Sequence, residues 1–204
     1  MEIRHHGAVG GVTGSCHELR LGESDAVLID CGLFQGAENS GKGANARDLA
    51  IEFSIEHIRA LIVTHVHIDH VGRIPYLLAA GFTGPIYCSQ PSARLLPVVL
   101  EDALKVGVTR NKRLIERVMQ RLQQIIRPVD YGVWQRIDVL GATPLAVQFR
   151  RAGHILGSAI VEVWLSENGV RRKVVFSGDL GQYDTPILND PSVIEEADHL
   201  IVES

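Results

Sequence analysis

Four side chains with metal-binding chemistry are crowded into seven positions of the sequence. The segment THVHIDH, residues 64–70, follows the apolar run ALIV and contains three histidines and one aspartate. On an extended or tightly turning segment, His65, His67 and Asp69 alternate to one side, while His70 turns to a neighbouring point. Zinc prefers imidazole and carboxylate ligands in catalytic sites, and no nearby thiolate offers a closed structural site. The spacing favours two adjacent metal ions over a chance cluster of turn residues, because buried histidine and aspartate side chains need polar partners.

Three further polar residues stand where an apolar run stops beside glycine. They are Asp30 in VLIDCG, His154 in GHILGSA and Asp179 in VVFSGDLG. Catalytic residues collect at such strand ends. Alone, each is more often a turn-forming aspartate or a surface histidine. Together with residues 64–70, they supply the ligands that a binuclear site lacks.

Short aliphatic and β-branched runs provide the strands that position these residues. Strands buried on both faces are predicted at 26–30, 60–65 and 84–89, and an alternating one at 17–21. Later strands are expected within 136–140, 145–153, 159–179 and 199–204. The sequence ENG at 167–169 indicates a hairpin turn. The glycine- and asparagine-rich segment 32–48 is typical of a long exposed loop.

Two helices are expected between the two groups of strands. The first begins at Pro91 and ends at Gly107, with its apolar face formed by Leu95, Leu96, Val99, Ala103 and Val106. The second covers 110–127, with its apolar face formed by Leu114, Ile115, Val118, Leu122, Ile125 and Ile126. Strands, two helices and further strands predict an α+β layered fold.

The second helix also carries a basic face. Four arginines recur at three- and four-residue steps: Arg110, Arg113, Arg117 and Arg121. From 110 to 127 there are six basic residues and a single acid, Glu116. A solvated helix face is the commoner meaning of such a run. A strip that contacts phosphates is the alternative.

Length, charge and cysteine content narrow the class of protein. The 204 residues correspond to one large domain or to a domain and a fragment. The net charge of −4 gives no sign of a nucleic-acid binder. Three well-separated cysteines, Cys16, Cys31 and Cys88, form no CxxC pair and are expected to be small buried side chains in a reducing compartment. Neither a signal peptide nor an apolar stretch of roughly 18 residues is found, so a soluble cytoplasmic protein without a membrane span is expected.

At this point the motifs resemble a known family. His65, His67, Asp69 and His70 match the HxHxDH signature of the metallo-β-lactamase superfamily, and Asp30, His154 and Asp179 match its other motifs in order and approximate spacing. The stretches LIDCGLFQG, HIDHVGRIPYL, GHILGSA and FSGDLG look like the β-CASP branch, which includes the J-type bacterial ribonucleases and the messenger-RNA 3′-end processing endonuclease. The resemblance runs from the first strand to the last residue. It implies a metallo-β-lactamase-type αββα sandwich and hydrolysis of RNA phosphodiester bonds, with single-stranded RNA as partner.

The resemblance also implies a role for each residue. His65, His67 and His154 would bind one zinc ion, Asp69 and His70 a second, and Asp179 would bridge the two. Three residues would assist catalysis. Asp30 holds a ligand or the metal-bound water, Asp69 also accepts the proton of the attacking hydroxide, and Glu203 in IVES matches the first β-CASP motif close to the metal site.

The sequence departs from the β-CASP pattern at its end. In that branch a cap domain follows the glutamate, and further strands then complete the fold, whereas here the sequence stops at Ser204. Residues 1–204 are therefore expected to be the amino-terminal part of the domain, with the cap that begins near 203 absent. The sandwich would be incomplete at the C-terminus and the second zinc site would lack a ligand. Self-association, and so a homo-oligomer, is expected through the uncovered sheet edge.

Two alternatives to a ribonuclease stay open. One is another hydrolase of the superfamily, such as a thioesterase, a lactonase or a tRNA 3′-processing enzyme, against which GRIP and GHILGSA stand. The other is a non-catalytic metal-binding or RNA-associated module.

The remaining histidines have weaker signals. His57 and His199 are expected to be solvent-exposed. His5, His6 and His17 flank the loop GAVGGVTGS, which could line the active site or contact phosphate through its backbone N–H groups.

Overall fold

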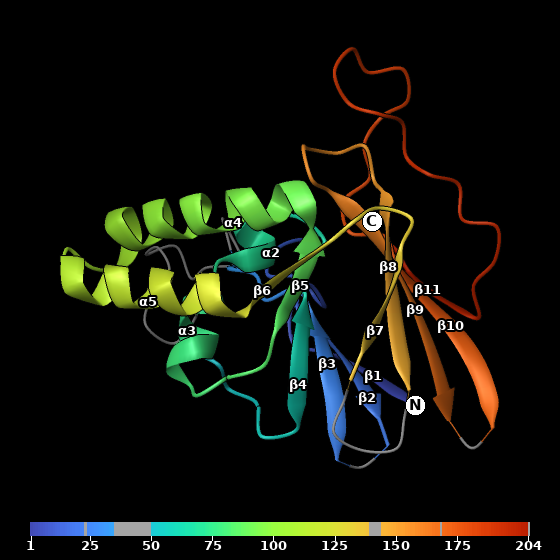
Figure 1. The fold of residues 1–204 in the computed structure, drawn as a ribbon, viewed down its shortest axis with the longest axis horizontal. Coiled ribbons are helices and arrows are strands. Elements are labelled where there is room, and N and C mark those ends of the chain that lie inside the picture. The colour runs from blue at the N-terminus through green and yellow to red at the C-terminus, as the bar shows by residue number, and fades with distance from the viewer. Residues whose placement is uncertain (23, 35–49, 139–143, 168, 204) are drawn as a thin grey trace.

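The computed structural model consists of two β-sheets packed face to face, with helices on the outer face of one of them (Figure 1). It describes residues 1–22, 24–34, 50–138, 144–167 and 169–203. The first sheet has six strands: β1 (Glu2–His5), β2 (His17–Leu21), β3 (Asp25–Ile29), β4 (Ile58–Ile62), β5 (Ile86–Ser89) and β6 (Ile126–Val129). The second sheet has five: β7 (Trp134–Ile137), β8 (Leu145–Arg151), β9 (Ala159–Glu167), β10 (Val170–Phe176) and β11 (His199–Ile201).

Strand direction in the first sheet decides where the functional loops meet. Strands β3, β4, β5 and β6 are parallel neighbours in that order, so their carboxyl ends lie at one edge of the sheet. All five residues of β3 are buried, because the second sheet covers one face and the helices cover the other. Asp30 follows β3 directly, and Thr64 and His65 come shortly after β4.

Among the described residues, four helices and a π-helical turn cover the first sheet. They are α2 (Ile68–Val71), α3 (Ile74–Ala79), α4 (Gln90–Ala103), the turn Leu104–Val108 and α5 (Lys112–Ile125). The two long helices begin where capping residues predict a start. The Ser89 hydroxyl accepts from the Ser92 N–H at 3.3 Å, and Asn111 Oδ1 accepts from the Leu114 N–H at 3.3 Å.

Two details of the predicted helix faces are wrong. Val106, expected on the apolar face of the first helix, is 81% exposed. It lies in the π-helical turn, which has more residues per turn than an α-helix, so its side chain no longer follows the apolar face of α4. Leu114 is also exposed, since the buried face of α5 is formed by Ile115, Leu122 and Ile125.

The second sheet confirms the predicted hairpin. Strands β9 and β10 pair antiparallel with Glu167 opposite Val170, around residue 168, which itself lies outside the described residues. The predicted loop 32–48 falls mostly outside them as well, and so does the end of the strand predicted at 136–140. The expected α+β fold with two sheets is confirmed. Within the described ranges, helices cover the first sheet and none covers the outer face of the second.

The expected burial of the three cysteines is confirmed. Cys16, Cys31 and Cys88 are buried, free thiols. Among the described residues, no helix combines the length and the apolar composition that a bilayer crossing demands.

Candidate metal centre

The seven-residue histidine segment forms a tight turn at the carboxyl edge of the first sheet. His67 stands at the N-cap position of the short helix α2, Ile68–Val71, which turns the chain back after β4. Neighbouring loops fasten this turn through the backbone. The Ser15 N–H donates to Asp69 O at 2.9 Å, and the Cys31 N–H donates to His70 O at 2.8 Å. Gly32 packs so closely that an added Cβ would lie 1.5 Å from Asp69 O, which explains the glycine there.

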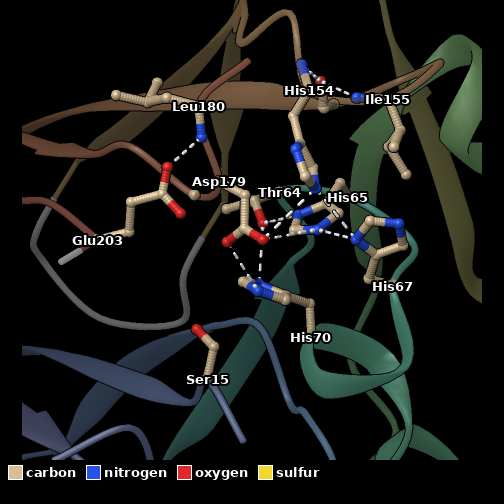
Figure 2. Close-up of polar contacts among 12 residues, drawn as sticks. Ser15, Thr64, His65, His67, His70, His154, Ile155, Asp179, Leu180 and Glu203 are labelled. Carbon is tan, nitrogen blue, oxygen red and sulfur yellow. Dashed lines mark hydrogen bonds and ion pairs between the residues drawn. The ribbon is translucent and has the colours of Figure 1, made fainter. Parts of the chain in front are cut away.

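Four side chains from three loops converge at this edge (Figure 2). They are His65, His67, His154 and Asp179, and one ligand atom from each lies within 4.8 Å of the others. His67 Nδ1 lies 3.1 Å from His65 Nε2 and 3.1 Å from His154 Nε2. Oδ2 of Asp179 lies 3.7 Å from His65 Nε2 and 3.5 Å from His154 Nε2. The structure thus brings together predicted ligands as far apart in the sequence as His65 and Asp179, which are separated by 114 positions.

His70 lies on the other side of Asp179. Its Nε2 is 3.1 Å from Oδ1 of Asp179, and its Nδ1 is 2.8 Å from Oδ2 of Asp30. The two oxygens of Asp179 therefore face different histidines. Asp30 is 1% exposed and contacts the ring nitrogen of His70 that points away from Asp179.

Two hydroxyl residues that sequence reasoning missed hold this arrangement in place. Thr64 donates to Asp30 twice, from its N–H to Oδ1 at 2.8 Å and from its hydroxyl to Oδ2 at 2.7 Å. Ser158 Oγ accepts from the N–H groups of His154 and Ile155 at 3.1 and 3.2 Å. The signal was present in the sequence, because a hydroxyl residue lies next to the first histidine motif and another lies in GHILGSA.

Burial and neighbouring charges set the protonation of the cluster. Burial, aided by the charge of His70, lowers the pKa of His65 to about 3. Burial and His154 also lower the pKa of His67. Burial raises the pKa of Asp179, but the hydrogen bond and charge of His70 outweigh it and lower this pKa to about 2. Neutral imidazoles and an ionised carboxylate are the forms that bind a cation.

His70 behaves in the opposite way. Burial lowers its pKa, but Asp30 and Asp179 outweigh burial and raise it to about 10. The shift arises because its two ring nitrogens face two carboxylates, and a metal ion bound at Nε2 would displace the proton of that nitrogen.

The donor set fits a metal ion. Ligands at about 2.0–2.1 Å from one tetrahedral ion lie roughly 3.3 Å from each other. The two spacings of 3.1 Å between histidine nitrogens are close to that value. His67 Nδ1 faces two histidine nitrogens, but a ring nitrogen is either a donor or an acceptor. Hydrogen bonds among the three imidazoles therefore contribute little to holding them together. The cluster can therefore hold a metal ion.

A cavity of about 590 Å³ opens beside the cluster on the His70 side. Its lining includes Asp69, His70, Asp179 and Glu203. Oε1 of Glu203 accepts a hydrogen bond from the N–H of Leu180, the residue after Asp179. Asp69 and Glu203 thus line the cavity and do not belong to the close cluster of His65, His67, His154 and Asp179.

Comparison with known proteins identifies the family of this chain. The family model described as the metallo-beta-lactamase superfamily matches residues 9–203. The chain belongs to this superfamily. The resemblance predicted from the HxHxDH motif and the strand-end residues is confirmed.

Relatives within the superfamily place the chain among proteins with RNA-related names. It is 41% identical to Ribonuclease TTHA0252 of Thermus thermophilus over 100% of this chain and 43% of that protein. It is 33% identical to Transcription termination factor FttA of Methanocaldococcus jannaschii over 87% of this chain and 27% of that protein. The chain thus spans less than half the length of both relatives.

A solved structure supports the fold of the superfamily. A metallo-beta-lactamase of Cronobacter sakazakii superposes with a TM-score of 0.52 at 20% identity, covering 96% of this chain and 73% of that one. At this low sequence identity, the structural similarity supports a shared fold and carries no information about function.

One prediction about the histidines outside the superfamily motifs is wrong. The sequence predicts a solvent-exposed His57, but its Nε2 lies 2.8 Å from Oε1 of Glu18 and its side chain is only 17% exposed. His6 Nε2 lies 2.7 Å from the other oxygen of Glu18. The reason is that Glu18 is buried, and a buried carboxylate needs partners. His199, at the start of β11, is exposed as predicted.

Proposed function

We propose that the cluster of His65, His67, His154 and Asp179 binds zinc. A second zinc ion is proposed on the other side of Asp179, held by His70 and Asp69. The observation that carries the pair is the position of Asp179. Its Oδ2 faces His65 and His154, while its Oδ1 faces His70, which is the arrangement of a bridging carboxylate.

We further propose that the whole protein hydrolyses phosphodiester bonds of single-stranded RNA. When bound, a pair of zinc ions supplies Lewis acidity for an in-line displacement at phosphorus. The names of the relatives, a ribonuclease and a transcription termination factor, support RNA as the substrate class. The two motifs GRIP and GHILGSA support the β-CASP branch over other hydrolases. We also propose that the protein is cytoplasmic and that it self-associates.

The chain's own residues have distinct proposed tasks. Asp69, on the cavity wall, is positioned to take the proton from the attacking nucleophile. Asp30 keeps the ring of His70 oriented toward Asp179. Glu203 holds the loop that carries Asp179 through the N–H of Leu180.

Cleavage of labelled single-stranded RNA tests the proposal. The purified whole protein is assayed on this RNA with zinc, after chelation and after zinc is restored, and a thioester and a lactone are tested as alternative substrates. We expect RNA cleavage that chelation abolishes and zinc restores, and its loss in the double variant His65→Ala, His67→Ala. The variant His199→Ala controls for removal of a histidine. Hydrolysis of the thioester or lactone with intact RNA would show another hydrolase of the superfamily, and bound zinc without any hydrolysis would show a non-catalytic module.

A further inference from the structure

The charge of this chain is distributed unevenly. Residues 110–127 contain six Lys and Arg and one acid, while the rest of the chain contains 14 Lys and Arg against 23 Asp and Glu. The solubility of the whole protein does not explain why basic residues are concentrated in one segment of an acidic chain. Such a segment creates a local positive potential that attracts anions.

The structure places this segment on the surface. Helix α5 buries Ile115, Leu122 and Ile125 against the core, and its opposite side faces solvent. The exposed residues Arg113, Arg117, Gln120 and Gln124 recur at four- and three-residue steps, so they form one row along the helix. We call this row, with the adjoining Arg110, Lys112 and Arg127, the α5 strip. From Arg113 to Gln124 the row is about 16 Å long.

Four charged side chains of the α5 strip have no partner in the part of the chain that the structure describes. Within the described residues, Arg110, Lys112, Arg113 and Arg117 make no ion pair and no side-chain hydrogen bond. Arg127 donates only to backbone carbonyls, to Gln124 O at 2.8 Å and Ile126 O at 2.9 Å. Free guanidinium groups are strong donors to phosphate oxygens.

One end of the strip leads toward the metal centre. Strand β6 follows α5 directly and pairs in parallel with β5, with Val129 opposite Ser89. The Ser89 hydroxyl donates to Gly157 O at 2.6 Å, in the loop that carries His154. Figure 1 shows α5 running along the outside of the first sheet to the start of β6, and β6 then runs to the edge where the carboxyl ends of the strands lie. The C-terminal end of the strip is thus joined through β6 to the edge of the sheet that carries the metal cluster.

We propose that the α5 strip binds the phosphate backbone of the RNA substrate away from the bond that is cut. This inference rests on the proposed function. The chemistry favours RNA over other anionic partners. Arginine and glutamine donate to phosphate and sugar oxygens without reading the base, as a processive or sequence-tolerant contact requires. A membrane surface fits less well, because the apolar face of α5 is buried against the core and has no side chains to insert.

Equilibrium binding of single-stranded RNA without cleavage tests the inference. Metal-free protein is titrated into fluorescent RNA over a range of salt concentrations, comparing the parent with the double variant Arg113→Gln, Arg117→Gln. Glutamine keeps the helix propensity and removes two charges. We expect at least a tenfold loss of affinity. The plot of log K against log salt should also be shallower by about 1.4, which is about 0.7 for each phosphate that the variant no longer neutralises.

The control removes the same charge elsewhere. The variant Arg136→Gln, Arg172→Gln changes two exposed arginines on the five-stranded sheet and should bind RNA within about twofold of the parent. Circular dichroism and zinc content show that each variant is folded.

Failure of this inference differs from failure of the proposed function. The variant His65→Ala, His67→Ala should bind RNA through the strip while it loses cleavage. If the Arg113, Arg117 variant binds RNA with the parent's affinity and salt dependence, the strip is not an RNA site, whatever the metal centre does. If the strip variant instead loses binding only to an acidic peptide or to anionic vesicles, the partner is of that class and the RNA assignment is wrong.

Discussion

Oδ2 of Asp30 lies 2.8 Å from Nδ1 of His70, and this contact fixes the direction of the imidazole. Thr64 occupies both carboxylate oxygens of Asp30 from the other side, so the aspartate itself cannot turn. The backbone of Asp30 has a positive φ of 60°, a conformation that aspartate and asparagine tolerate better than most residues. Asp30 is therefore held at the end of β3 to orient a side chain that belongs to another loop.

Replacing Asp30 with asparagine tests this orienting role. Asparagine keeps the shape and tolerates the backbone, but its amide group no longer offers a carboxylate to His70 Nδ1. We expect metal affinity to fall about 10–100-fold, as for other partners that orient metal-binding histidines. Zinc titration with a competing chelator measures it, and Thr64→Ser, which keeps the hydroxyl, is the mild control. Unchanged affinity in Asp30→Asn would mean that His70 needs no orientation.

Asp179→Asn tests the bridge. Since each oxygen of Asp179 faces a different set of histidines, loss of its charge should release the zinc ion on the His70 side first. The ion near the three histidines should be retained, because neutral imidazoles hold it. Metal stoichiometry measured during stepwise chelation follows the release of the two ions. Simultaneous loss of both ions, or loss of neither, contradicts a bridging position.

The candidate metal residues were predictable from sequence for a physical reason. Parallel strands bring their carboxyl ends to one edge, so polar residues that end such strands must meet. Asp30 and the 64–70 segment follow neighbouring parallel strands, β3 and β4, of the first sheet. His154 and Asp179 follow strands β8 and β10 of the second sheet, and the glycine-flanked strand ends together with the family resemblance indicated them.

Other features depend on contacts that no local pattern encodes. The pairing of His57 with Glu18 joins residues 39 positions apart, and only the packing of the loop before β4 against β2 creates it. Strand β6 is short and follows a helix without a turn signal, and it forms because β5 offers an open edge. The exposure of Val106 follows from a π-helical turn, which sequence periodicity does not reveal.

Gly32→Ala tests the close contact behind the histidine turn. A Cβ at position 32 would lie 1.5 Å from Asp69 O and 2.8 Å from His70 N, so the turn must move. We expect a loss of at least about 2 kcal/mol in the free energy of unfolding, together with weaker zinc binding. Gly107→Ala is the matched control, because a Cβ there meets nothing within 4 Å. It should be neutral or stabilising by up to about 1 kcal/mol in urea unfolding. Equal effects of the two changes would count against the contact.

The pH dependence of stability tests the environment of His17. Burial lowers the pKa of His17 to about 4, against the opposing effect of Asp30, from an ordinary value of 6.5. Between those two values the unfolded chain binds a proton that the folded chain does not, so this contribution to stability is present above pH 6.5 and lost as the pH falls toward 4.

His17→Gln removes that proton uptake. In metal-free protein, the free energy of unfolding should drop less between pH 7 and pH 4.5 than in the parent, by roughly 1–3 kcal/mol. Urea unfolding at several pH values measures the difference, and His199→Gln controls for loss of an exposed histidine. An identical pH profile for the parent and His17→Gln would show that His17 is not buried in its neutral form.

Zinc content after purification and dialysis tests the metal centre most directly. The parent protein should retain zinc, because the nitrogens of His65, His67 and His154 already lie at the spacing of ligands around one ion. The variant His65→Ala, His67→Ala should retain none, while His5→Ala, His199→Ala, which removes the same number of histidines elsewhere, should match the parent. If the first variant holds as much zinc as the parent, the cluster is not the metal site.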